Sequence, residues 1–114
     1  MVAVRSFTRG AQIAPKKLRI ILNEVRDKRV DEALSILRFM PTPHARTVAK
    51  VVRSAVANAE SNYNLDPRGL RIVAAHAGDG LRLKRFIPRA RGRADIKWRR
   101  RANITVVVDE REER

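Results

Sequence analysis

The most informative stretch of the chain is residues 82–101, which read Arg82-Leu83-Lys84-Arg85-Phe86-Ile87-Pro88-Arg89-Ala90-Arg91-Gly92-Arg93-Ala94-Asp95-Ile96-Lys97-Trp98-Arg99-Arg100-Arg101. The stretch begins with strand-like alternation and runs directly into a second strand-like segment. Pro88 and Gly92 lie near its middle, where reversal of the chain is easiest. The pattern predicts a long β-hairpin.

The charge of this segment is exceptional. It holds ten Lys or Arg and one acid, so ten minus one gives +9 of the chain's +14, and the remaining residues carry +5. A compact domain cannot bury so many guanidinium groups, because each would lose its hydration without a partner. We therefore expect the hairpin to hang in solvent or to lie along a polyanion, of which nucleic acid is the first candidate.

Composition limits the rest of the molecule. The 114 residues, of which 44% are hydrophobic, suit one modest domain with a small core. The absence of Cys excludes a disulfide scaffold and a Cys-based zinc site, and it fits a reducing compartment. Arg5 and Arg9 interrupt the apolar residues near the start, and no later run approaches a membrane span. We expect a cytoplasmic protein that is neither exported nor inserted in a membrane.

Three helices are predicted between residues 15 and 63. Pro15 suits a first helical turn, and Asp31 and Glu32 suit the start of a second helix over Val30–Phe39, which Pro41 ends. Thr42 followed by Pro43 predicts a cap and first turn for the third and longest helix. Apolar residues recur at helical spacing in the first helix at Leu18, Ile21, Leu22 and Val25, and in the third at Val48, Val51, Val52, Ala55, Val56 and Ala59.

Strand patterns flank these helices and the hairpin. Residues 2–13 contain a short alternating strand; Leu70, Ile72 and Ala74 alternate with their neighbours; and residues 103–108 are almost wholly β-branched. The simplest topology pairs the last two strands antiparallel and lets the hairpin extend them. The predicted fold class is α+β: three helices packed on a small antiparallel sheet, with a long basic β-hairpin projecting. We expect one domain over residues 1–114, divided into a body (1–79 and 102–114) and an extended arm (80–101).

Two details of the hairpin are open to more than one interpretation. Phe86 and Trp98 are equally far from Gly92, so they face each other if the reversal centres there; the alternative is that one ring stacks on an RNA base. Strict alternation also breaks at Lys84 and Arg85, which predicts a bulge that bends the hairpin.

Four stretches of the chain match one known pattern, in order. They are Ala14-Pro15-Lys16-Lys17-Leu18-Arg19, Ser54-Ala55-Val56-Ala57-Asn58-Ala59-Glu60-Ser61-Asn62, Leu83-Lys84-Arg85-Phe86-Ile87-Pro88-Arg89-Ala90-Arg91-Gly92-Arg93-Ala94-Asp95 and Ile104-Thr105-Val106-Val107-Val108. With them the chain resembles the large-subunit ribosomal protein twenty-two family over nearly its whole length. The third stretch is the most specific, since it resembles that family's tunnel hairpin.

The resemblance implies a place in the ribosome. The body would lie on the outside of the large subunit near the exit, and the hairpin would reach through rRNA to line the nascent-peptide tunnel, near the site where macrolide antibiotics block it. The implied partners are large-subunit rRNA, neighbouring large-subunit proteins and the nascent polypeptide. The implied mechanism is scaffolding, in which Lys and Arg would neutralise converging phosphates and cross-link rRNA segments during assembly.

Two sets of residues are predicted to carry these roles. The tunnel-lining tip comprises Lys84, Arg85, Phe86, Ile87, Pro88, Arg89, Ala90, Arg91, Gly92 and Arg93. The rRNA-binding set comprises Lys16, Lys17, Arg19, Lys50, Arg53, Arg82, Lys84, Arg85, Lys97, Arg99, Arg100 and Arg101, with simple solvation as the alternative for the five helix positions. We expect no catalytic residue, no metal, no cofactor and no homo-oligomer.

The chain departs from the family pattern at a few positions. Ala14 stands where a capping Ser is usual, Asp27 where a helix-ending Gly is common, and Asn103 where a His is frequent. Gly78-Asp79-Gly80 replaces a more familiar Glu-Gly-Pro at the hairpin base. These changes concern caps, a strand end and the exit of the hairpin, and they leave the basic motif intact.

Two other classes of protein share some of these features. A DNA-bending architectural protein also carries basic β-arms, and Pro88 would then wedge between base steps, but the alternating Arg residues after it favour phosphate contacts. An enzyme needs a constellation, yet His44 opens a helix, His76 lies in a strand, and the carboxylates Glu24, Glu60 and Asp79 share no metal-site spacing. Neither alternative explains the concentrated charge as well as rRNA binding does.

Overall fold

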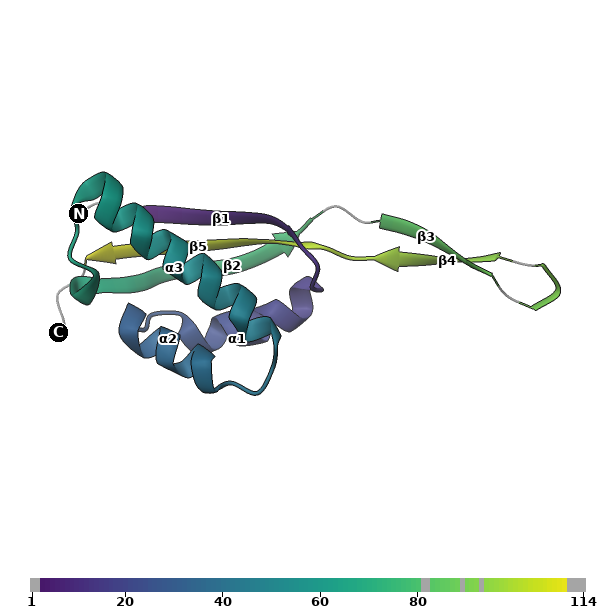
Figure 1. The fold of residues 1–114 in the computed structure, drawn as a ribbon, viewed down its shortest axis with the longest axis horizontal. Helices are drawn as coiled ribbons and strands as arrows, with labels where there is room; N and C mark the ends of the chain where they lie inside the picture. Colours follow the sequence, from purple (N-terminus) through teal and green to yellow (C-terminus); the bar gives the residue numbers. More distant parts are fainter. Residues whose placement is uncertain (1–2, 81–82, 89, 93, 111–114) are drawn as a thin grey trace.

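The computed structural model describes residues 3–80, 83–88, 90–92 and 94–110, with the backbone alone at 83, 85 and 95–99. Three helices cover one face of a sheet, and a hairpin projects beyond both along the long axis (Figure 1). This arrangement confirms the predicted α+β fold. The elements are β1 (Val4–Ala11), α1 (Pro15–Val25), α2 (Val30–Phe39), α3 (His44–Tyr63), the 3-10 turn η1 (Pro67–Gly69), β2 (Leu70–Asp79), β3 (Leu83–Pro88), the turn η2 (Ala90–Gly92), β4 (Ala94–Arg99) and β5 (Ala102–Glu110).

The helices follow the predicted patterns closely. Pro15 begins α1, and α2 has the predicted bounds. Helix α3 begins at His44, one residue later than predicted, because Pro43 takes the N-cap position. The Thr42 hydroxyl still caps this turn, since its Oγ1 accepts a hydrogen bond from the His44 N–H at 3.4 Å.

Asp27 follows the end of α1 in a left-handed conformation, with φ of 63°. Its N–H donates to the Ile72 carbonyl at 2.9 Å, which ties the helix end to β2. A non-glycine residue is sterically disfavoured there, and a carboxylate beside a helix C-terminus opposes the dipole. The position therefore explains physically why Gly is common there in the family pattern.

We expect Asp27→Gly to raise the free energy of unfolding by about 0.5–1 kcal/mol, because it removes both unfavourable effects. Asp27→Asn is the matched control, since it removes the charge and keeps a side chain of the same size, and it should recover only a few tenths of a kcal/mol. Urea unfolding followed by circular dichroism measures both. A loss of stability in the Gly variant would mean that the Asp27 side chain makes a favourable contact.

The sheet of the body has the order β1-β5-β2, and both pairings are antiparallel. Helix α3 packs on β1 and β5, and α1 packs on β2. The central strand β5 buries Ala102, Ile104, Val106 and Val108 completely against this layer. All buried core residues in the described part of the chain lie at 4–77 or 102–108, so the described hairpin adds nothing to the core.

Strand β2 differs from the predicted alternation. Leu70 and Ile72 are buried as expected, but Ala75 and Ala77 follow them inside instead of Ala74. The register shifts between Ile72, opposite Val108, and Ala74, opposite Val107, so Val73 is the extra residue of a β-bulge. The Ile72 N–H and carbonyl both bond to the α1–α2 connection, at Lys28 and Asp27, and this fixes Ile72 while the strand beyond it switches faces.

The hairpin register corrects two predictions. Phe86 lies opposite Ile96, and Trp98 lies opposite Lys84, so the two aromatic residues do not face each other. The reason is the position of the turn. Pro88 and Ala94 are the last residues that pair, so the reversal is centred on Arg91, midway between them. Arg91 and Gly92 both adopt the left-handed conformation that the turn requires. The bulge predicted at Lys84 and Arg85 is also wrong, because pairing continues without a shift from Leu83–Arg99 to Pro88–Ala94.

Candidate nucleic-acid interface

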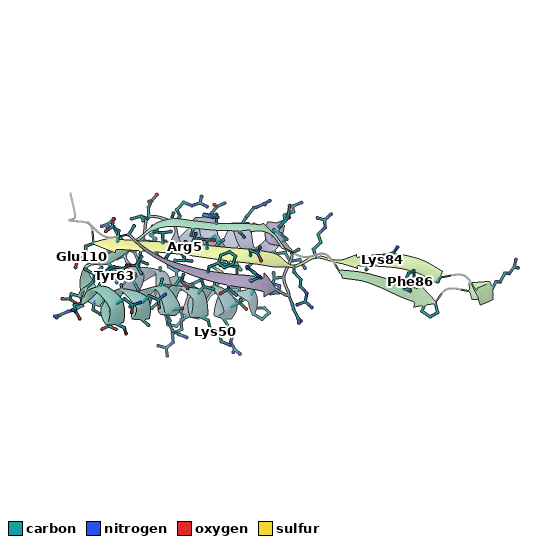
Figure 2. The ribbon with its side chains drawn as sticks, turned by 90° about the horizontal axis from the view of Figure 1, so that it is seen from above. Arg5, Lys50, Tyr63, Lys84, Phe86 and Glu110 are labelled. Carbon is teal, nitrogen blue, oxygen red and sulfur yellow. The ribbon has the colours of Figure 1, made fainter. Side chains whose placement is uncertain are left out.

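The described hairpin presents a basic and an aromatic side chain side by side. Lys84 is exposed, and its ammonium nitrogen lies 5.4 Å from the centroid of the Phe86 ring, which is 67% exposed. Residues two apart in a strand share a face, so this cation–π contact follows from the register (Figure 2). The pair can offer a charge to a phosphate and a ring to a base. Base stacking by Phe86 stays a prediction.

The tip is a tight turn that displays Arg91. Ala90, Arg91 and Gly92 are all exposed, as is Pro88, while Ile87 is half-buried. Arg91 and Gly92 have φ values of 63° and 72°. Such a turn faces its arginine outward, where the planar guanidinium can pair with phosphate. Of the predicted tip and rRNA-binding residues, Arg82, Arg89 and Arg93 lie outside the described residues, as do the side chains of Arg85, Lys97 and Arg99.

A polar clamp joins the base of the hairpin to β1. The Asn103 Oδ1 accepts a hydrogen bond from the Gly10 N–H at 3.0 Å, and the Arg101 guanidinium donates to the Gly10 carbonyl at 3.3 Å. The Gly80 N–H donates to the Arg101 carbonyl at 2.8 Å, across the two strands that lead into the hairpin. Gly10 adopts φ of 70° at a register shift in β1. Arg101 is therefore half-buried and bonded within the protein, whereas Arg100 is exposed.

The clamp would crowd a side chain at Gly80. A Cβ atom there would lie 3.0 Å from the Arg101 carbonyl oxygen and 3.2 Å from Asn103 Oδ1. We expect Gly80→Ala to lower the free energy of unfolding by about 1–2 kcal/mol. Gly78→Ala is the matched control, because nothing lies within 4 Å of its new Cβ, and it should change stability by less than about 0.5 kcal/mol. If denaturant unfolding gave the same change in free energy for both variants, the backbone around Arg101 would have shifted to accommodate the added methyl group at no cost.

Helix α1 carries three predicted cations at its exposed face. Lys16, Lys17 and Arg19 are all exposed, and the Arg19 Nε donates to the Ala77 carbonyl at 3.4 Å. Arg26, which is not in the predicted rRNA-binding set, donates to the Ala75 carbonyl at 2.6 Å. Arg19 and Arg26 therefore line the outer edge of β2. In the sequence, their spacing of seven residues indicated only that they lie on the same side of α1.

Lys50 and Arg53 lie at a groove between α2 and α3. The groove has a volume of about 610 Å³, and Arg38 and Arg46 share its rim. Leu34, Leu37, Met40, Pro41, Thr42, Pro43 and Ala49 complete the lining, and none of these described residues is acidic. Figure 2 shows Lys50 projecting outward from α3. The sequence indicated the α3 cations but not Arg38, because α2 brings that residue alongside them only through tertiary packing.

The described residues do not bring together the side chains that the enzyme alternative would need. Among them, no group of three His, Asp or Glu side chains is placed to hold a metal ion. His44 is half-buried at the start of α3, and the other candidates are exposed: Glu24 on α1, Glu60 near the end of α3, and His76 and Asp79 on β2. Hydrogen bonds from the Arg68 backbone and side chain lower the pKa of Asp66, the N-cap residue of η1. No described helix combines the length and apolarity needed to cross a membrane.

Comparison with known proteins agrees with this geometry. Residues 6–109 match the family described as ribosomal protein L22p/L17e. The large ribosomal subunit protein uL22 of Thermoanaerobacter sp. (strain X514) is 48% identical over 108 residues, which cover 95% of this chain and 97% of that protein. The same-named proteins of Clostridium novyi (strain NT) and Thermomicrobium roseum are 47% and 42% identical, over 94% of this chain and 96% and 91% of their own lengths. The chain therefore belongs to the ribosomal protein L22p/L17e family.

Proposed function

We propose that this chain is a structural constituent of the large ribosomal subunit, in the cytoplasm, that binds and cross-links large-subunit rRNA during assembly. One observation carries the proposal: a hairpin with a net charge of +9 extends from the two strands, β2 and β5, that anchor the core. A body fixed on one rRNA segment can thereby hold a distant cationic arm against another. The names of the relatives support a ribosomal role, and neutralising crowded phosphates requires no catalytic group.

The hairpin tip is proposed to line the nascent-peptide tunnel. Residues 84–93 would meet both rRNA and the nascent polypeptide, with Arg91 at the apex. The shape supports this, since the molecule is 64 Å long but only 27 Å by 19 Å across, and the hairpin forms its thin end (Figure 1). A narrow, two-stranded element can pass between packed RNA helices where a layered domain cannot.

The body is proposed to contribute the rRNA contacts that the hairpin does not make. Lys16, Lys17 and Arg19 would bind through α1, and Lys50 and Arg53 through the groove, together with Arg38 and Arg46. Arg101 is the weakest member of the predicted set, because its guanidinium already bonds to Gly10. Arg100, exposed beside it, is the better candidate.

Sedimentation of the tagged chain from lysate, after a high-salt wash, tests the proposed role. Co-migration with the large subunit supports an integral ribosomal protein. Migration with nucleoid DNA or as free protein would instead favour a DNA-bending architectural protein. Binding of the purified chain to structured rRNA and to duplex DNA is a second test. Tighter binding to duplex DNA at the same salt concentration would contradict the rRNA role.

We further propose that the body folds independently of the arm, with residues 1–79 and 102–114 forming the body and 80–101 the arm. Deletion of residues 84–93 should therefore shift the melting temperature by less than about 3 °C, since the described hairpin buries no core residue. Thermal unfolding of the deleted and full chains, followed by circular dichroism, measures the shift. Melting of the body on deletion would show that the arm is part of the folding unit.

A further inference from the structure

The face of the sheet opposite the helices is open and carries rings and cations. Strand register defines its rows: Phe7 lies beside Thr105, which lies beside His76, and Arg5 lies beside Val107, which lies beside Ala74. Figure 2 looks down on the sheet from above, with Arg5 on β1. None of these residues belongs to the arm, to α1 or to the α2–α3 groove described above.

Two rings stand out from this face. Phe7 is 47% exposed, and His76 is exposed, although both sit in the middle of strands. They flank Thr105, which is buried at the centre of the row, so the rings are about 10 Å apart across two strand spacings. Ala74 and Gly78, two residues before and after His76, are small, which leaves the sides of its ring open.

Cations flank the aromatic ring along its own strand. Arg5 is exposed two residues before Phe7, on the same face and about 7 Å away along β1. Arg9 is exposed two residues after Phe7, where the β1 register shifts. Asp109 is on the same face but at the far end of β5, where it pairs in register with Arg71. The surface around Phe7 is therefore positive.

We infer that this open face binds an unpaired stretch of RNA, with one base stacked on Phe7, another beside His76, and the phosphates next to the first base at Arg5 and Arg9. Exposed aromatics on a sheet, set among arginines, stack bases of single-stranded RNA irrespective of sequence. A protein partner is disfavoured, because the residue between the rings is the short, polar Thr105 and the rings therefore form no continuous apolar patch. The inference rests on the proposed rRNA-binding role and adds a contact of different chemistry, stacking rather than phosphate neutralisation.

The test uses the full chain and a single-stranded uridine octamer as the probe, with fluorescence anisotropy as the readout. Phe7→Leu keeps an apolar strand residue and removes the ring, so the Kd should rise roughly tenfold, and Phe7→Leu with His76→Gln should raise it further. Tyr63→Leu is the matched control, since Tyr63 is similarly exposed (51%) at the end of α3, and its Kd should be unchanged. Circular dichroism verifies that each variant is folded.

A second measurement separates this inference from the proposed function. Ultraviolet crosslinking of the chain to large-subunit rRNA, mapped by mass spectrometry, should place a crosslink on the peptide containing Phe7. If Phe7→Leu and Tyr63→Leu bind the octamer alike and no crosslink maps to β1, the open face is not an RNA site. In that case, the proposed function still holds if rRNA binding depends on the hairpin cations. If rRNA binding depends neither on the hairpin cations nor on the open face, the proposed function and this inference are both contradicted.

Discussion

Replacement of Lys84, Arg91 and Arg100 by Gln is expected to weaken binding to large-subunit rRNA on the order of 100-fold, at about 1 kcal/mol for each solvent-exposed phosphate contact that is lost. All three side chains are exposed and are spread from the base of the hairpin to its tip. The plot of log K against log salt should become shallower by about one unit for each phosphate interaction that the substitutions remove. The slope identifies the cause, because it measures how many counterions leave the RNA phosphates on binding. Loss of an apolar contact lowers the affinity but leaves this number unchanged.

The matched control compares two single substitutions of equal charge. Arg68→Gln removes an exposed arginine of η1, whose guanidinium pairs with Asp66 and which lies outside the hairpin. Arg91→Gln should weaken rRNA binding several-fold, and Arg68→Gln should have little effect. Equal effects would mean that binding follows net charge alone. Changing Arg99, Arg100 and Arg101 together is less clean, since Arg101 also holds the clamp at Gly10.

Replacement of Ile104 by Ala is expected to cost about 3–4 kcal/mol of unfolding free energy. Ile104 is completely buried in the central strand, between Thr8 of β1 and Ala77 of β2. The cavity cannot close readily, because strands on both sides and helices on one face hold the backbone in place. For a domain whose total stability is about 5–15 kcal/mol, this reduction is a large fraction.

Ile20→Ala is the matched control for that substitution. Ile20 lies on α1 and is 66% exposed, so the same truncation should change stability by less than about 0.5 kcal/mol. Denaturant unfolding of both variants gives the comparison. A small effect at Ile104 would contradict the central position of β5, from which the hairpin arises.

The basic interface was predictable where its charges are contiguous in sequence. Residues 82–101 indicate a hairpin through alternation and central Pro and Gly residues, and a polyanion partner through their charge. Helical spacing indicates the cations of α1 and α3. The groove was only half predictable, since Arg38 reaches Lys50 and Arg53 through the packing of α2 on α3. The paired rings of the open face were not predictable, because Phe7 and His76 are brought together only across β5.

By itself, the sequence determined the helices, the strands and the basic hairpin, because helical period, strand alternation and Pro or Gly punctuation act over a few neighbouring residues. The tertiary structure decided the bulge at Val73, the centring of the hairpin on Arg91 and the clamp between Asn103 and Gly10. The clamp joins residues 93 positions apart. Such contacts depend on how strands align and which backbone groups remain unpaired once the core has closed, and no local pattern encodes that choice.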